Sequence, residues 1–99
     1  MIAYTVACTF QNEALAEEWI QWLLDEHLAE VIDAGAMDAS VVKLDGNTPR
    51  CEVHYHFESR EAFNAYEREH APRLRDAGLA KFPLKRGLSY IRSVGEVVA

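Results

Sequence analysis

The amino-acid sequence predicts an α+β fold: one domain over residues 1–99, with elements in the order strand, helix, strand, strand, helix, strand. Two observations carry this prediction. Apolar residues alternate with polar or small residues in several short stretches, which is typical of strands with one buried face. Two longer stretches have apolar residues at intervals of three and four, and both contain Glu-His followed by Asp-Ala-Gly. A chain of 99 residues has room for a single hydrophobic core.

Residues 2–10 are predicted to form the first strand, and a helix is expected to follow it. The strand has an apolar face (Ile2, Tyr4, Val6, Cys8, Phe10) and a face of small residues (Ala3, Thr5, Ala7, Thr9). Asn12 is a good N-cap, because its side-chain oxygen can accept a hydrogen bond from the first helical turn. Gly35 ends the helix, since glycine tolerates the left-handed backbone of a C-terminus. The predicted buried stripe, flanked by Trp19 and Trp22, is Ala16, Ile20, Leu23, His27, Val31 and Ala34.

Residues 37–45 and 51–58 are predicted to form a hairpin. The loop between them, Asp-Gly-Asn-Thr-Pro, has the composition of a turn. The second strand of the hairpin alternates strictly. Its apolar face is Cys51, Val53, Tyr55 and Phe57, and its polar face is Glu52, His54, His56 and Glu58.

The second helix is expected to begin at its N-cap, Ser59, and to end at Gly78. Pro72 has no N–H group and its ring crowds the preceding turn, so we expect a kink or a restart just after His70. The first helix has Ala29 at the equivalent place and is expected to run straighter. The predicted stripe of the second helix is Phe63, Tyr66, His70, Leu74 and Ala77. A basic connection over residues 79–86 and a last strand over residues 87–98 complete the chain.

Right-handed crossovers convert this order into a ferredoxin-like βαββαβ arrangement, in which a four-stranded antiparallel sheet carries two helices on one face. The first and third strands are expected to be central neighbours, running parallel to each other. In that orientation Cys8 and Cys51 lie about 20 Å apart, which excludes a disulfide. Both cysteines fall in apolar rows and are expected to be buried.

Charge and hydropathy exclude some partners. The formal net charge is −6, which argues against nucleic acid, because phosphate binding needs a positive surface. No apolar run approaches the roughly 20 residues that span a bilayer, and the N-terminus lacks the basic region of a signal peptide. We therefore expect a cytoplasmic protein with no membrane partner.

Several residues of both helices resemble the bacterial domain-of-unknown-function family numbered 4286. They are Glu18, Trp19, Trp22, His27, Val31 and Gly35, then Tyr66, Glu69, His70, Ala71, Pro72, Leu74, Gly78 and Phe82. The chain departs from the family pattern at Ala29, where the family has a proline, and at Met37, where it has an aromatic residue. The resemblance implies a fold similar to the dimeric α/β-barrel group, in which two ferredoxin-like units join through their sheets. Some members of that group oxidise aromatic substrates or degrade haem, and others only bind ligands.

The two helical histidines are candidates for a small-molecule pocket. His27 and His70 lie on the predicted buried stripes, where an imidazole can act as acid, base or ligand near neutral pH. The candidate walls of the pocket are Tyr4, Tyr55, Tyr66 and Trp22. The structural alternative is that each histidine only hydrogen-bonds a buried carbonyl or hydroxyl group. No third metal ligand accompanies the two histidines, so we expect no metal and no cofactor there. We expect His70 to matter more than His27, because Pro72 opens the helix beside it.

The polar row of the third strand has two interpretations. His54 and His56 share one face and form a weak candidate metal site. The same face, beside the small residues of the first strand, permits the close approach of a second sheet. The sequence therefore predicts a homodimer joined through the polar sheet faces.

Two functions remain open from the sequence. The first is a dimeric domain that binds a small ligand or has a regulatory role. The second is an enzyme of the dimeric-barrel type, a monooxygenase-like oxidoreductase or an isomerase, which uses His27 or His70 with a tyrosine. No nucleophile elbow, phosphate loop or cysteine-histidine signature favours another chemistry.

Overall fold

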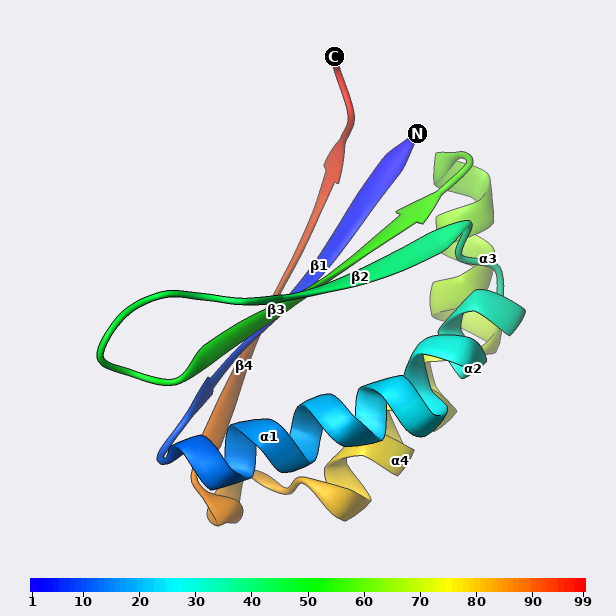
Figure 1. The fold of residues 1–99 in the computed structure, drawn as a ribbon. Helices are drawn as coiled ribbons and strands as arrows, with labels where there is room; N and C mark the ends of the chain where they lie inside the picture. Colours follow the sequence, from blue (N-terminus) through cyan, green and yellow to red (C-terminus); the bar gives the residue numbers. More distant parts are fainter.

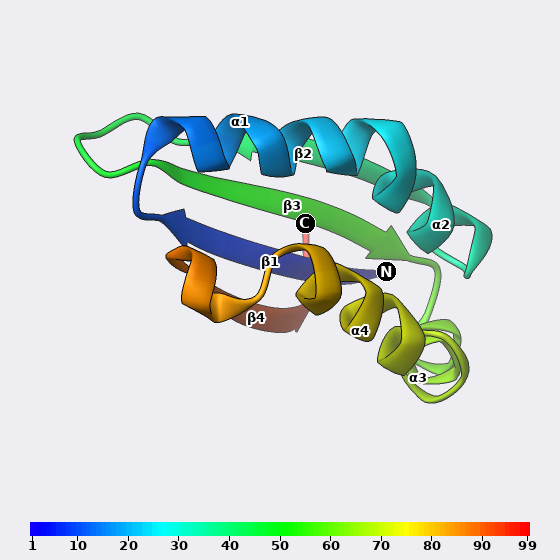
Figure 2. The ribbon, with the colours of Figure 1, turned by 90° about the horizontal axis from the view of Figure 1, so that it is seen from below.

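The computed structural model describes residues 1–99 and confirms the α+β prediction. Four strands form one sheet in the order β2-β3-β1-β4, with antiparallel neighbours throughout. Two helical segments cover one face of this sheet (Figure 1, Figure 2). The elements are β1 (Ile2–Phe10), α1 (Glu13–Trp22), the π-helical turn η1 (Leu23–His27), α2 (Leu28–Asp33), β2 (Asp38–Lys43), β3 (Arg50–Phe57), α3 (Arg60–Glu69), α4 (Ala71–Lys81), the 3₁₀ turn η2 (Leu84–Arg86) and β4 (Leu88–Glu96).

The prediction that the first and third strands are parallel is wrong. The crossover helix makes β2 parallel to β1, and the β2–β3 hairpin then reverses the chain, so β3 runs antiparallel to β1. Cys8 and Cys51 are consequently direct cross-strand partners and not 20 Å apart. Both are free thiols with side chains buried in the core. Burial raises the pKa of Cys8 to about 12 and also raises that of Cys51, so both stay protonated and unreactive at neutral pH.

The first helical segment begins as predicted and then departs from a straight α-helix. Asn12 caps α1 by accepting a hydrogen bond from the Leu15 N–H at 2.9 Å. The π-helical turn η1 follows, and it ends at His27. Residues spaced by four drift gradually around an α-helix, and the wider π-helical turn offsets this drift. Val31 is therefore buried like Trp19. Trp19, predicted at the flank of the stripe, therefore lies at its centre.

The second helical segment breaks where the proline predicted a break. Ser59 caps α3, and His70 leaves helical geometry at φ −126° and ψ −38°, between α3 and α4. Pro72 stands in the first turn of α4, where its missing N–H costs nothing. Gly78 does not end the helix, because α4 continues to Lys81. Instead it leaves room for the Trp22 ring, which a Cβ at this position would meet at 3.3 Å.

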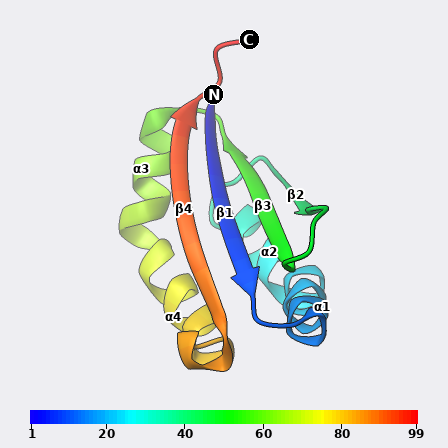
Figure 3. The same cartoon turned by 90° about the vertical axis from the view of Figure 1, so that its left-hand side faces the viewer.

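The hydrophobic core lies between the sheet and the helical segments, whereas the opposite face of the sheet has no helix. The core contains 20 buried residues, none of them charged. Figure 3 shows the open face, with β4, β1, β3 and β2 side by side in front of the helices. Half-buried small residues follow β1 along this face: Ala3, Thr5, Ala7 and Thr9. None of the helices is both long and apolar enough to span a membrane.

Candidate functional site

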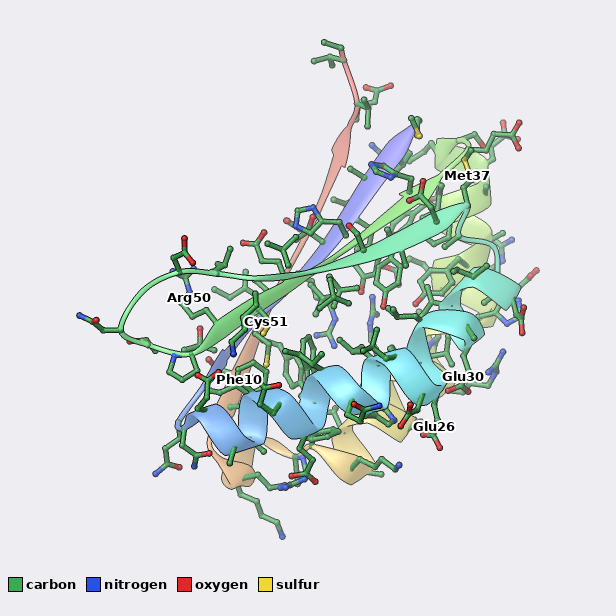
Figure 4. The ribbon with its side chains drawn as sticks, viewed as in Figure 1. Phe10, Glu26, Glu30, Met37, Arg50 and Cys51 are labelled. Atoms are coloured by element: carbon green, nitrogen blue, oxygen red, sulfur yellow. The ribbon has the colours of Figure 1, made fainter.

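A cavity opens between the sheet and the two helical segments. Figure 4 shows side chains from both layers pointing into this space. The enclosed free volume is about 50 Å³, and the empty space reaches about 510 Å³ when the open mouth is included. Eleven of the 15 lining residues are hydrophobic. This composition is typical of small-molecule sites, which are mostly apolar with a few polar groups.

Five of the six residues proposed for the pocket line this cavity. His27 and Trp22 come from the first helical segment, and three tyrosines, Tyr4, Tyr55 and Tyr66, come from the sheet and α3. Their role in holding a ligand stays a prediction.

His70 lies outside the cavity, and the expectation that it is largely buried is wrong. The residue is only half-buried, and its Nδ1 is 2.8 Å from Arg73 Nη2 at the surface. The helix break explains the difference, because the non-helical backbone of His70 removes its side chain from the stripe of Phe63 and Tyr66. His27 and His70 share a sequence pattern without sharing an environment.

His27 is a neutral imidazole at physiological pH. Burial lowers its pKa to about 4, and the positive charge of Arg92 acts in the same direction. The ring stacks on Trp22, with 4.4 Å between centroids and an interplanar angle of 20°. Its Nδ1 is buried and has no hydrogen-bond partner. A buried polar atom without a partner is costly, so this nitrogen marks a place where a ligand atom can bind favourably.

The tyrosines form an aromatic wall against the sheet. Tyr4 and Tyr55 stack at 5.8 Å, and Tyr4 and Tyr66 are tilted at 6.2 Å. Burial raises the pKa of both Tyr55 and Tyr66, so their phenol groups stay neutral and can donate hydrogen bonds. The wall presents flat apolar faces with polar tips, which suits a planar ligand.

Two arginines that the sequence analysis did not select also line the cavity. Arg75 of α4 pairs with Glu67 at 2.8 Å and donates to the Tyr4 hydroxyl at 3.4 Å, while its buried Nε has no partner. Arg92 of β4 lies over the Tyr90 ring at 5.5 Å and forms no ion pair within 4.0 Å. Arg92 was detectable in principle, because strand alternation places it in the row of Leu88 and Tyr90, which otherwise faces the core.

The histidines of β3 lie on the open face of the sheet, and each contacts a carboxylate. His54 contacts Glu52 at 2.9 Å, and His56 contacts Asp38 at 2.7 Å. Each imidazole is thus held by a separate carboxylate, and nowhere in the chain do three or more such side chains converge as a metal site requires.

The family model described as "Domain of unknown function (DUF4286)" matches residues 1–93. No curated protein matches the sequence. Two solved structures of dimeric ferredoxin-like proteins from an uncultured marine organism have TM-scores of 0.75. They are 16% and 20% identical, and the alignments cover 100% and 99% of this chain and 96% and 95% of theirs. The cofactor-independent oxygenase SnoaB from Streptomyces nogalater has a TM-score of 0.68 at 10% identity, with 99% of this chain and 93% of SnoaB covered. The TM-scores show a shared fold, and at such low identities they show the fold alone.

Proposed function

This chain belongs to the DUF4286 family, and from that premise we propose that it is a homodimer that binds a small ligand in the cavity between sheet and helices. The observation that carries the proposal is the position of the buried polar atoms without partners. There are three in the chain, on Trp19, His27 and Arg75, and all three residues line this one cavity. The Tyr90 hydroxyl lies beside the Trp19 indole, whereas the other two atoms have no such neighbour. A purely structural core satisfies or excludes such groups.

Filling the cavity should abolish ligand binding. Val6 lines the cavity, so Val6→Phe places a ring in the free space. The matched control is Val98→Phe, because Val98 is 92% exposed. Ligand-observed NMR with a library of small aromatic compounds is the measurement. We expect the wild type and the control to bind the same compounds and Val6→Phe to bind none. Equal binding by all three proteins would place the ligand elsewhere.

We further propose that two copies join through their open sheet faces. The small residues along β1 permit close packing of a second sheet, and the two dimeric structural neighbours support the proposal. Ala7 lies near the middle of this face, opposite Glu52 on one side and Ile91 on the other. Ile91 is 73% exposed in the single chain, so pairing would cover it.

The substitution Ala7→Glu should convert the dimer into monomers. It places a second carboxylate beside Glu52 in each copy, and uncompensated charge in an interface costs several kcal/mol. The control is Ala14→Glu, on the exposed side of α1. Light scattering at micromolar concentration should give dimers for the wild type and the control. A monomeric wild type, or a dimeric Ala7→Glu, would contradict the proposal.

An enzymatic function is the second candidate, favoured by the chemistry of His27. A neutral imidazole with a free nitrogen, in a cavity also lined by phenol groups, can accept a proton from a bound ligand. The structural similarity to SnoaB, described as a cofactor-independent oxygenase, is consistent with this candidate. Oxygen consumption with ligands found in the binding screen distinguishes the two candidates. Turnover that is lost in His27→Phe while binding is kept would favour the enzyme.

A further inference from the structure

We propose that the cavity selects a compact planar aromatic acid, a single ring bearing a carboxylate, and that Arg92 anchors the carboxylate. This inference rests on the proposed function and names the class of ligand. It follows from three independent features: the charges that line the cavity, the hydrogen-bonding groups left unpaired, and the shape of the walls.

The cavity is positive in a chain that is negative overall. Two arginines line it, and none of the 15 lining residues is an aspartate or glutamate. Its only histidine is neutral. The chain as a whole carries a formal charge of −6, so this distribution is a local exception. Positive charge in a partly apolar cleft attracts anions, because the low dielectric strengthens the interaction.

Arg92 carries the unmatched charge. Arg75 is paired with Glu67, and this ion pair neutralises most of the charge of Arg75. Glu67 itself does not line the cavity. Arg92 forms no ion pair, and the residue is exposed to solvent. Its position over the ring of Tyr90, itself a lining residue, holds the planar fork at the cavity. An arginine fork matches a carboxylate with two parallel hydrogen bonds, which a lysine cannot do.

The unpaired groups favour a ligand that accepts hydrogen bonds. The Arg75 Nε atom carries an N–H group that can only donate and has no acceptor, whereas the Trp19 N–H has the Tyr90 hydroxyl beside it. The neutral His27 can present its Nδ1 in either role, depending on its tautomer. An ionised carboxylate accepts hydrogen bonds at both oxygens and donates none. The surplus of donors therefore favours an acid over an amide, an alcohol or an amine.

The walls and the free volume restrict the body of the ligand. Tyr4, Tyr55 and Tyr66 offer flat faces, and the Trp22–His27 stack lies on the helical side. Planar rings pack on such faces with favourable offset or edge geometry. The small free space favours one ring over a fused ring system.

Benzoate and benzamide test the inference, because they share size and shape and differ in charge. The chain has two tryptophans, Trp19 and Trp22, and both line the cavity, so the two indole N–H signals in a ¹H–¹⁵N spectrum report its occupancy. We expect benzoate to bind at least about 10-fold more tightly than benzamide, the ratio given by one charge-assisted hydrogen bond. We expect Arg92→Gln to weaken benzoate about 10-fold and to leave benzamide unchanged.

Arg60→Gln is the matched control, since Arg60 is exposed, forms no ion pair and does not line the cavity. It should leave the ratio of the two affinities unchanged. Equal affinities for benzoate and benzamide would overturn the selection of acids while leaving the proposed function standing. An Arg92→Gln variant that binds benzoate as the wild type does would overturn the proposal that Arg92 anchors the carboxylate. If neither compound moves the indole signals, this ligand class is wrong. The cavity-filling comparison then decides separately whether the cavity binds any small molecule.

Discussion

Replacing Trp19 with alanine should lower the free energy of unfolding by about 3–5 kcal/mol, the range for removing a large buried aromatic side chain. Trp19 is only 2% exposed, and its ring meets Phe10 edge to face at 5.3 Å. It also lies 6.4 Å from Tyr90, so it joins the helical layer to β1 and β4. The cavity beside it grows on truncation, because the sheet cannot collapse into the space. Urea unfolding measures the loss.

The matched control is Trp22→Ala, the same change one turn later in the first helical segment. Trp22 is half-buried, and its partners are His27, Phe82 and the backbone at Gly78. We expect less than half the destabilisation, because part of the ring already contacts water. Equal losses in the two variants would show that Trp19 is not the centre of the core.

His27 should make the protein less stable as the pH falls from about 6.5 to about 4. Its pKa is lowered from 6.5 to about 4 in the folded state, chiefly by burial and then by Arg92. Between these values the unfolded chain binds a proton that the folded chain does not, so unfolding becomes easier. The stabilisation is present above pH 6.5 and lost as the pH approaches 4. The expected loss is about 2–3 kcal/mol, reduced from the full linkage value because the ring is partly exposed.

Urea unfolding at several values between pH 4 and pH 7 tests this dependence in the wild type and in His27→Phe. The variant should lose this part of the pH dependence, since phenylalanine does not titrate. His70→Phe is the matched control for the change from histidine to phenylalanine, because His70 lies at the surface beside Arg73 and does not line the cavity. The difference between wild type and variant removes the contribution of the carboxylates, which both proteins share. Identical slopes for wild type and His27→Phe would refute a buried, neutral His27.

Features set by near neighbours in the chain were predictable from sequence. Asn12 and Ser59 cap their helices because each side chain reaches an N–H group only three residues away. The break at His70 follows from Pro72 by backbone chemistry within one turn. The buried row of β3 follows from the pleat, which sends alternate side chains to opposite faces.

The candidate site was predictable only where it coincided with these local patterns. Tyr4, Tyr55 and Tyr66 were found because apolar periodicity marks the face of an element that meets the core. The same reasoning misplaced His70, because a stripe drawn through a helix break no longer describes one face. It also passed over Arg92, a charged residue in a row that otherwise points to the core.

Sequence alone determined the order of elements, the faces of the strands and the ends of most helices, because those depend on contacts within about one turn or one pleat. Only the tertiary structure decided that Cys8 faces Cys51, that Gly78 accommodates Trp22, and that Arg75 and Arg92 reach the same cavity as His27. These relations join segments far apart in the chain. They depend on the register in which β3 pairs with β1 and on how the π-helical turn rotates the first helical segment, and no local pattern of residues encodes either.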